Sequence, residues 1–309
     1  MKGVLVSATL TLDTLFRAAF TAEDPSVELL LPEEVDDPAA IDFALAWRPQ
    51  PGVLKRYPNL KVICSIAAGV DNILADPELP DVPVVRMVDP KQSEAMALFV
   101  IWHVLWYQRR FDLYLEQQAA RVWQRQPQRG AAETTVAVLG LGRMGSVVAR
   151  RLAGLGYPTL GWARSPRAIE GVEVLSGAEG LKQLLARTDA LINLLPLTAQ
   201  TRGLLDASFF ARMKPGAYLI QMGRGPHLVE NDLRAAIDSG HLTGASLDVF
   251  EQEPLPPDHD FWAHPRILVT PHCASDATAD LVAVQTLAAA RAAVAGAEIP
   301  NVVDRAAGY

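Results

Sequence analysis

The sequence predicts an α/β protein with two doubly wound parallel-sheet domains and an active-site cleft between the domains. Three observations favour this fold: a length of 309 residues, short apolar runs that alternate with amphipathic runs, and a long helical segment between the two alternating regions. At roughly 100–200 residues per domain, a chain of this length forms about two domains. Alternating strands and helices are typical of parallel sheets that are covered by helices.

The N-terminal third alternates expected strands with expected helices. Strands are expected over residues 4–6, 27–31, 43–46, 62–66 and 82–85, and helices over 12–20 and 53–57. Short runs rich in β-branched and other apolar residues are typical of buried strands. Asp89-Pro90 interrupts the pattern, and a long helix is then expected from about 93 to 123, before Pro127 and Gly130.

A second alternation fills most of the remaining chain. Strands are expected over 135–139, 159–162, 190–194, 217–221, 244–247 and 267–270, with helices that include 144–155 and 231–238. A long alanine-rich helix is expected from about 274 to 295. The pattern therefore predicts one domain over 98–272 and another over 1–97 plus 273–309, to which the C-terminal helix returns.

The composition argues against nucleic acid and membranes as partners. The net charge is −7 and the sequence pI is about 5.4, so the surface repels phosphate groups and acidic lipids. The longest apolar run, 97–107, is shorter than the ~20 residues of a spanning helix, so a buried helix is expected there. The chain has two cysteines, Cys64 and Cys273, and no signal-peptide pattern at its start, which together favour a reducing, cytoplasmic location.

A glycine-rich loop follows the expected strand at 135–139. Its sequence is Gly140-Leu141-Gly142-Arg143-Met144-Gly145, and a helix-forming run comes next. The first glycine permits a tight turn, the second lets the backbone approach a pyrophosphate, and the third lets helix and strand pack closely. Free N–H groups at the helix N-terminus favour negative charge. The order of these elements predicts a dinucleotide site, although a purely structural turn has the same glycines.

The end of the next strand indicates which dinucleotide is bound. An NAD site usually has Asp or Glu about 20 residues past the glycines, where it accepts a hydrogen bond from the ribose 2′-OH. Here Arg164, Ser165 and Arg167 occupy this region, and the first nearby carboxylate is Glu170. Arginines bind a 2′-phosphate that a carboxylate would repel, so NADP(H) is the expected cofactor, with NAD(H) as a second choice. The alternative is a solvated surface loop that carries two arginines.

Three later segments carry candidate catalytic groups, each near the end of an expected strand. They contain Arg224, Glu253 and His272. Each residue alone also has a simpler interpretation, as a surface charge or a structural histidine. Together they suit the reduction of a 2-keto acid, because an arginine binds the carboxylate and a histidine protonates the alkoxide that hydride transfer leaves. A nearby carboxylate favours the charged imidazolium.

These motifs resemble the D-2-hydroxyacid dehydrogenase family, and within it the glyoxylate/hydroxypyruvate reductase A branch. The resemblance covers nearly the whole chain. It is carried by the motifs Ala68-Gly69-Val70-Asp71, the glycine loop, residues 191–198, Gly223-Arg224-Gly225, residues 248–256, Thr270-Pro271-His272 and residues 303–309.

The resemblance implies a Rossmann fold for both domains, with a flavodoxin-like, substrate-binding domain over 1–97 plus 273–309 and an NAD(P)-binding domain over 98–272. It implies Arg224, Glu253 and His272 as catalytic residues, and no bound metal. Trp47, Ala68 and Gly69 would contact the substrate. The implied cofactor-binding residues are Gly140, Gly142, Arg143, Met144, Gly145, Arg164, Ser165, Arg167, Leu195, Pro196, Thr201, Met222 and Asp248. It also implies a homodimer, formed through the cofactor domain and the helical arm over 111–123.

The chain departs from the family pattern beside two of these groups. Gln221-Met222-Gly223 replaces the more usual Asn-x-Ala before Arg224, and Cys273 follows His272 where an apolar residue is typical. The expected function is NADPH-preferring reduction of a small 2-keto acid of the glyoxylate or hydroxypyruvate type to the D-2-hydroxy acid. Two alternatives remain: an NAD(P)-dependent dehydrogenase for a larger 2-keto acid, and a dinucleotide-sensing protein without turnover. The combination of Arg224, Glu253 and His272 argues against the sensor.

Overall fold

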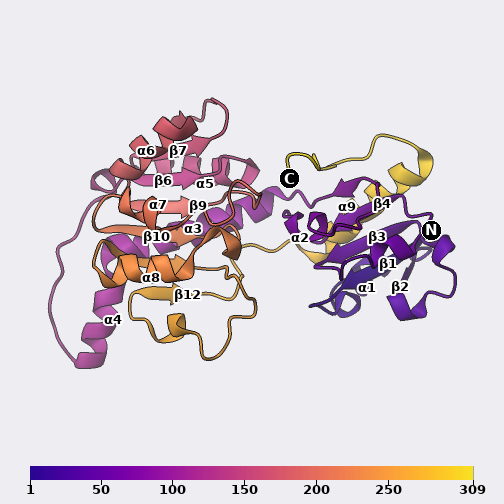
Figure 1. Ribbon diagram of the computed structural model, residues 1–309, viewed down its shortest axis with the longest axis horizontal. Coiled ribbons are helices and arrows are strands. Elements are labelled where there is room, and N and C mark those ends of the chain that lie inside the picture. The colour runs from indigo at the N-terminus through magenta and orange to yellow at the C-terminus, as the bar shows by residue number, and fades with distance from the viewer. Residues whose placement is uncertain (309) are drawn as a thin grey trace. The chain divides into compact units, whose positions relative to one another are not determined.

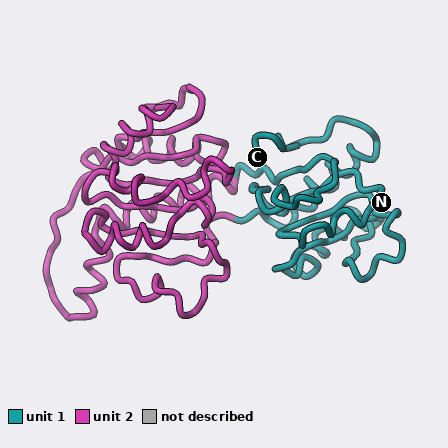
Figure 2. Tube along the Cα trace, in the orientation of Figure 1, with its two compact units in different colours: residues 1–90, 276–309 teal, residues 91–275 magenta. Residues whose placement is uncertain are grey.

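The computed structural model describes residues 1–308 and confirms the α/β fold with two parallel sheets (Figure 1). Two compact units divide the chain: unit 1 comprises residues 1–90 and 276–309, and unit 2 comprises 91–275 (Figure 2). The divisions expected from the sequence fall after residues 97 and 272. In the structure, helix α3 (Pro90–Arg109) begins at the first division and stays almost entirely within unit 2. Tyr309, which ends the last family motif, lies outside the described residues.

Unit 1 contains a five-stranded parallel sheet in the order β2-β1-β3-β4-β5. This order is that of flavodoxin-like sheets. The strands are β1 (Lys2–Ser7), β2 (Glu28–Leu30), β3 (Phe43–Trp47), β4 (Val62–Ser65) and β5 (Val84–Val85), and the α-helices are α1 (Leu12–Glu23), α2 (Asp71–Leu74) and α9 (Ala279–Ala295). Helices α1 and α9 cover one face of the sheet, where Phe20 and Leu287 join the core. Ile73 of α2 belongs to the core of the other face.

Unit 2 contains a seven-stranded parallel sheet in the order β12-β11-β10-β9-β6-β7-β8. Its strands are β6 (Val136–Leu139), β7 (Thr159–Ala163), β8 (Val172–Ser176), β9 (Ala190–Asn193), β10 (Ala217–Gln221), β11 (Leu242–Leu247) and β12 (Ile267–Val269). The chain reverses its direction of strand addition between β6 and β9. This reversal is the topological switch point at which dinucleotides bind in Rossmann sheets.

Helices cover both faces of the sheet in unit 2. They are α3, α4 (Phe111–Ala120), α5 (Arg143–Gly154), α6 (Gly177–Arg187), α7 (Ala207–Ala211) and α8 (Glu230–Asp238). Apolar residues of α6, α7 and α8 pack on one face, and those of α3 and α5 pack on the other. Short 3₁₀ helices lie at Pro32–Glu34, Pro38–Ala40, Leu54–Arg56, Ala131–Glu133, Gly225–His227 and Asp260–Ala263. Among residues 1–308, no helix is both long enough and apolar enough to cross a membrane.

Several local expectations were wrong. The helix expected over 93–123 is two helices, because Arg110 has a left-handed backbone (φ 58°) that ends α3 before α4 begins. The helix expected over 53–57 is a 3₁₀ turn, and strand β8 was not predicted. The run 97–107 is not a fully buried helix, because Leu98 and Trp102 are 69% and 49% exposed. The last helix begins at Ala279, where Thr278 caps it by accepting from the N–H of Leu281.

Candidate active site at the carboxyl edge of the unit 2 sheet

The glycine loop lies at the carboxyl end of β6 and leads directly into α5. Gly140 has a left-handed backbone (φ +92°), which favours glycine. A Cβ on Gly145 would lie 1.9 Å from the carbonyl oxygen of Gly140, so the close approach of helix and loop requires glycine there. A Cβ on Gly142, the N-terminal cap of α5, would meet no protein atom within 4 Å. Protein atoms thus leave the space beside Gly142 open at the N-terminus of a 12-residue helix, where a pyrophosphate is favoured.

Arg164, Ser165 and Arg167 lie in the exposed loop after β7, the strand next to β6. The guanidinium of Arg167 donates to the carbonyl oxygen of Leu141, in the glycine loop. This hydrogen bond joins the two loops that hold the pyrophosphate and the adenosine ribose in a Rossmann site. No carboxylate occupies the position after β7, so the geometry suits a ribose that carries a 2′-phosphate.

The loop after β9 holds the predicted residues Leu195, Pro196 and Thr201. The hydroxyl of Thr201 donates to the carbonyl oxygen of Pro196 at 2.7 Å, which closes this loop on itself. The N–H of Leu195 donates to Oδ1 of Asn193 at 3.2 Å. Strand β9 lies beside β6 at the switch point, so this loop faces the same edge of the sheet as the glycines.

Arg224 follows β10 and precedes the 3₁₀ helix Gly225–His227. Its backbone N–H donates to Nδ1 of His227 at 3.1 Å, and its carbonyl oxygen accepts from Nε2 of Gln221 at 2.9 Å. Its guanidinium donates to the carbonyl oxygen of Gly223 at 2.9 Å. The side chain is partly exposed, whereas the residue before the loop, Met222, is buried.

The predicted pair of Glu253 and His272 is formed in the structure. Nδ1 of His272 lies 2.9 Å from Oε2 of Glu253, and the two side chains are 32% and 15% exposed. The other carboxylate oxygen of Glu253 accepts from the N–H of Phe250 at 3.1 Å, which fixes the orientation of the carboxylate. A carboxylate at Nδ1 leaves the other ring nitrogen, Nε2, to exchange a proton with a substrate.

Asp248 positions the histidine loop from the end of β11. Its carboxylate accepts from the hydroxyl of Thr270 at 2.6 Å and from the N–H groups of Cys273 and Ala274, each at 3.0 Å. These contacts lie on both sides of His272, which has a left-handed backbone (φ 53°). Asp248 is 1% exposed. From the sequence, Asp248 was expected only to bind the cofactor, and its role in holding this turn was missed.

The predicted substrate residues Trp47, Ala68 and Gly69 belong to unit 1. Trp47 ends β3, and Ala68 and Gly69 follow the neighbouring strand β4, so all three lie toward the carboxyl edge of that sheet. The hydroxyl of Ser65 accepts from the N–H of Ala67 at 3.1 Å and donates to the carbonyl oxygen of Gly69 at 3.0 Å. The cleft expected between the units stays a prediction.

Sequence reasoning missed three buried polar residues behind the site: Asn193, Gln221 and His227. All three are 0% exposed and hydrogen-bonded to one another or to the loops of the site. The sequence does carry a signal for two of them, because the apolar strands β9 and β10 end in the polar residues Asn193 and Gln221. Within residues 1–308, no group of three or more His, Cys, Asp or Glu side chains is arranged to hold a metal ion.

Comparison with known proteins agrees with this arrangement. The family model for the NAD-binding domain of the D-isomer specific 2-hydroxyacid dehydrogenases matches residues 101–274. A glyoxylate/hydroxypyruvate reductase A from Yersinia enterocolitica is 40% identical over 279 residues, which cover 88% of this chain and 89% of the relative. A protein of the same name from Serratia proteamaculans is 40% identical over 280 residues, 89% of each chain.

Two solved structures are similar over nearly their full length. A D-isomer specific 2-hydroxyacid dehydrogenase from Xanthobacter autotrophicus Py2, in complex with NADPH and MES, has a TM-score of 0.93 and 39% identity, covering 100% of this chain and 99% of that one. An NADPH-dependent glyoxylate/hydroxypyruvate reductase from Sinorhizobium meliloti, in complex with NADP and sulfate, has a TM-score of 0.92, 37% identity and the same coverage. The chain therefore belongs to the D-2-hydroxyacid dehydrogenase family, in its glyoxylate/hydroxypyruvate reductase A branch.

The space beside Gly142 generates the first prediction. Gly142→Ala should fold normally, because φ is −70° and the new methyl group meets no protein atom. The methyl group should instead occupy the space of the pyrophosphate and raise the Kd for NADPH about tenfold or more, a loss of about 1.4 kcal/mol or more. The matched control is Gly154→Ala at the other end of α5, where a Cβ also meets nothing. Fluorescence titration with NADPH should separate the two variants, and equal affinities would exclude the glycine loop as the pyrophosphate site.

Proposed function

We propose that this protein reduces a small 2-keto acid of the glyoxylate or hydroxypyruvate type to the D-2-hydroxy acid, with NADPH as the preferred hydride donor. The observation that carries the proposal is the 2.9 Å contact between His272 and Glu253 at the carboxyl edge that also carries the glycine loop. A cofactor site alone would serve a sensor equally well. An oriented acid beside it is needed only for chemistry.

Each catalytic residue has one task in this reaction. The guanidinium of Arg224 binds the substrate carboxylate and polarises the keto oxygen, because its planar fork offers paired donors. NADPH, when bound, supplies a hydride to the keto carbon. Nε2 of His272 donates a proton to the oxygen of that carbon, and the carboxylate of Glu253 stabilises the imidazolium before the transfer.

The remaining contacts are proposed from the family pattern. In unit 1, the backbone N–H groups of Ala68 and Gly69 hold the substrate carboxylate, and Trp47 lines the substrate mouth. In unit 2, Arg143, Met144, Leu195, Pro196, Thr201 and Met222 line the cofactor, and Asp248 contacts the nicotinamide carboxamide. Unit 1 would thus be the substrate-binding domain and unit 2 the NAD(P)-binding domain. The cytoplasmic location stays a prediction from cysteine usage.

Cofactor choice should depend on Arg164. Arg164→Leu removes a cation from the loop after β7 and should raise the KM for NADPH about tenfold or more, the scale of a lost hydrogen bond to a charged group. The KM for NADH should change little, because NADH has no 2′-phosphate. Arg150→Leu removes another exposed arginine, from α5, and serves as the control. Steady-state kinetics with both cofactors test this, and a wild-type enzyme that favours NADH would contradict it.

Turnover should depend on His272 far more than cofactor binding does. His272→Gln keeps a polar side chain but removes the acid, so kcat for hydroxypyruvate should fall by ~100-fold or more. The Kd for NADPH should stay close to the wild-type value. The control is His241→Gln, since His241 immediately precedes β11 at the amino end of the strand, where its Nε2 lies 2.8 Å from the carbonyl oxygen of Phe210. Near-normal turnover in His272→Gln would reject His272 as the proton donor.

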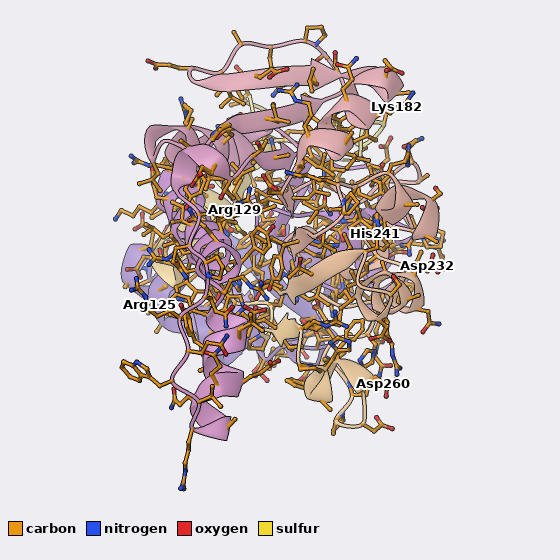
Figure 3. The ribbon with its side chains drawn as sticks, turned by 90° about the vertical axis from the view of Figure 1, so that its left-hand side faces the viewer. Arg125, Arg129, Lys182, Asp232, His241 and Asp260 are labelled. Atoms are coloured by element: carbon orange, nitrogen blue, oxygen red, sulfur yellow. The ribbon has the colours of Figure 1, made fainter. Side chains whose placement is uncertain are left out.

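We also propose that the protein is a homodimer, formed through α3, α4 and the segment that follows them. Seven exposed large hydrophobic side chains gather in this part of unit 2: Leu98, Trp102, Leu105, Phe111, Leu115, Val122 and Trp123. Exposed large apolar side chains on consecutive elements of this kind are typical of a protein interface. The chain after α4 carries Arg125 and Arg129 (Figure 3), and Arg129 forms a 3.1 Å ion pair with the buried Asp189. This segment is therefore anchored to unit 2.

The dimer proposal predicts a mass of about twice the 33.5 kDa of the chain in sedimentation experiments. Leu98→Glu places a charge on the exposed face of α3 and should shift the protein to monomers at micromolar concentration. Leu15→Glu is the matched control, because Leu15 is also exposed, at 49%, on helix α1 of unit 1. A monomeric wild type, or a dimer that Leu98→Glu leaves intact, would contradict the proposal.

A further inference from the structure

A buried polar cluster lies behind Arg224 and has no task in the chemistry described above. It consists of Asn193 at the end of β9, Gln221 at the end of β10 and His227 in the turn after Arg224. The side chains of all three are fully buried. Nδ2 of Asn193 lies 2.8 Å from Oε1 of Gln221 and 3.2 Å from Nδ1 of His227. Buried polar groups are costly unless they are hydrogen-bonded, so each of these side chains is held in one orientation by its partners.

The contacts of His227 fix the state of its ring. The backbone N–H of Arg224 lies 3.1 Å from Nδ1, and a backbone amide can only donate. Nδ1 therefore carries no hydrogen. Nε2 lies 3.2 Å from the carbonyl oxygen of Pro196, which can only accept, so Nε2 carries the hydrogen. The ring is neutral and spans two loops, with one nitrogen on each.

The contact at Nδ1 helps to set the direction of the catalytic arginine. The N–H of Arg224 is held by His227, and its carbonyl oxygen accepts from Nε2 of Gln221 at 2.9 Å and from the N–H of His227 at 3.1 Å. Both the N–H and the carbonyl oxygen of Arg224 are thus hydrogen-bonded, although Arg224 lies in neither a strand nor an α-helix. Fixing the backbone on both sides of Cα limits where the guanidinium can reach.

The contact at Nε2 reaches the cofactor-lining loop. The carbonyl oxygen of Pro196 accepts from Nε2 of His227 and also from the hydroxyl of Thr201, at 2.7 Å. The same buried cluster holds the start of this loop, because Oδ1 of Asn193 accepts from the N–H of Leu195. His227 therefore joins a substrate-binding group and a cofactor-binding loop through opposite atoms of one ring.

We propose that His227 is a positioning residue with two separable effects: Nδ1 orients Arg224 for the keto acid, and Nε2 orients the Pro196 loop for the cofactor. This proposal rests on the proposed function of Arg224. It assigns a function to a fully buried histidine that the proposed reaction does not otherwise use. It also explains why a neutral ring is required, because a proton on Nδ1 would remove the acceptor for the N–H of Arg224.

Two substitutions separate the effects. In His227→Asn, the amide oxygen lies near the position of Nδ1 and still accepts from Arg224, but the shorter side chain does not reach Pro196. In His227→Gln, the amide nitrogen lies near the position of Nε2 and still donates to Pro196, but no acceptor remains near the N–H of Arg224. His227→Gln leaves the N–H of Arg224 without its acceptor, and His227→Asn removes a donor from the carbonyl oxygen of Pro196. Losing a buried hydrogen bond is costly, so each variant should weaken one ligand about tenfold or more.

Two ligands are titrated against each variant: NADPH, and oxamate, a keto-acid analogue that is not reduced, added to the NADPH complex. His227→Gln should raise the Kd for oxamate and the KM for hydroxypyruvate while NADPH binding stays within about threefold of wild type. His227→Asn should raise the Kd for NADPH while the Kd for oxamate stays within about threefold of wild type. A merely structural histidine would lower the melting temperature in both variants and change both ligands together, and that result, or unchanged affinities, would overturn the proposal. Wild-type turnover tests the proposed function separately, because the oxamate and NADPH titrations need no reaction.

Discussion

Because β6, β9, β10, β11 and β12 run parallel, the loops that follow them all leave the sheet of unit 2 at one edge. The glycine loop, the Pro196 loop, Arg224, Asp248 and His272 each come directly after one of these strands. Residues that are up to 132 positions apart in the sequence, such as Gly140 and His272, are brought to one edge by backbone pairing alone. Side-chain contacts then orient the groups at this edge: Asp248 fixes the turn around His272, and Glu253 fixes the imidazole ring of His272.

Charge placement is the second constraint on the site. The chain has a net charge of −7, yet its proposed ligands, a keto acid and a dinucleotide, are anions. Long-range attraction therefore contributes nothing to binding, and local groups must supply it. The structure offers the N-terminus of α5 at Gly142, the arginines after β7, and Arg224 after β10. Each is a cation or an N–H donor at a strand end, where the ligand would displace water from a few oriented groups.

Much of this arrangement could be predicted from the sequence, because the relevant signals are local. A strand, three glycines and a helix in order predict the dinucleotide loop, and the pairing of His272 with Glu253 was predicted from their motifs and is formed.

The predictions that failed have physical causes. Arg110 breaks the long helix through a left-handed backbone that no residue type required. Leu98 and Trp102 are exposed, although an apolar run predicts burial, since hydropathy alone does not show which face of an apolar helix the rest of the chain covers. The cluster of Asn193, Gln221 and His227 depends on contacts between the ends of β9 and β10 and the turn after Arg224. A polar residue at the end of an apolar strand marks Asn193 and Gln221, but nothing along the chain shows that they meet His227.

The most direct test of the account is the transfer of hydrogen to the keto carbon. Hydroxypyruvate is incubated with the protein and NADPH deuterated at both positions of nicotinamide C4, and the product is analysed by chiral chromatography with mass detection. The account predicts D-glycerate with a single deuterium at C2, because hydride comes from the cofactor at the glycine loop and the proton on oxygen comes from His272. Absence of product, product without deuterium at C2, or the L isomer would contradict it.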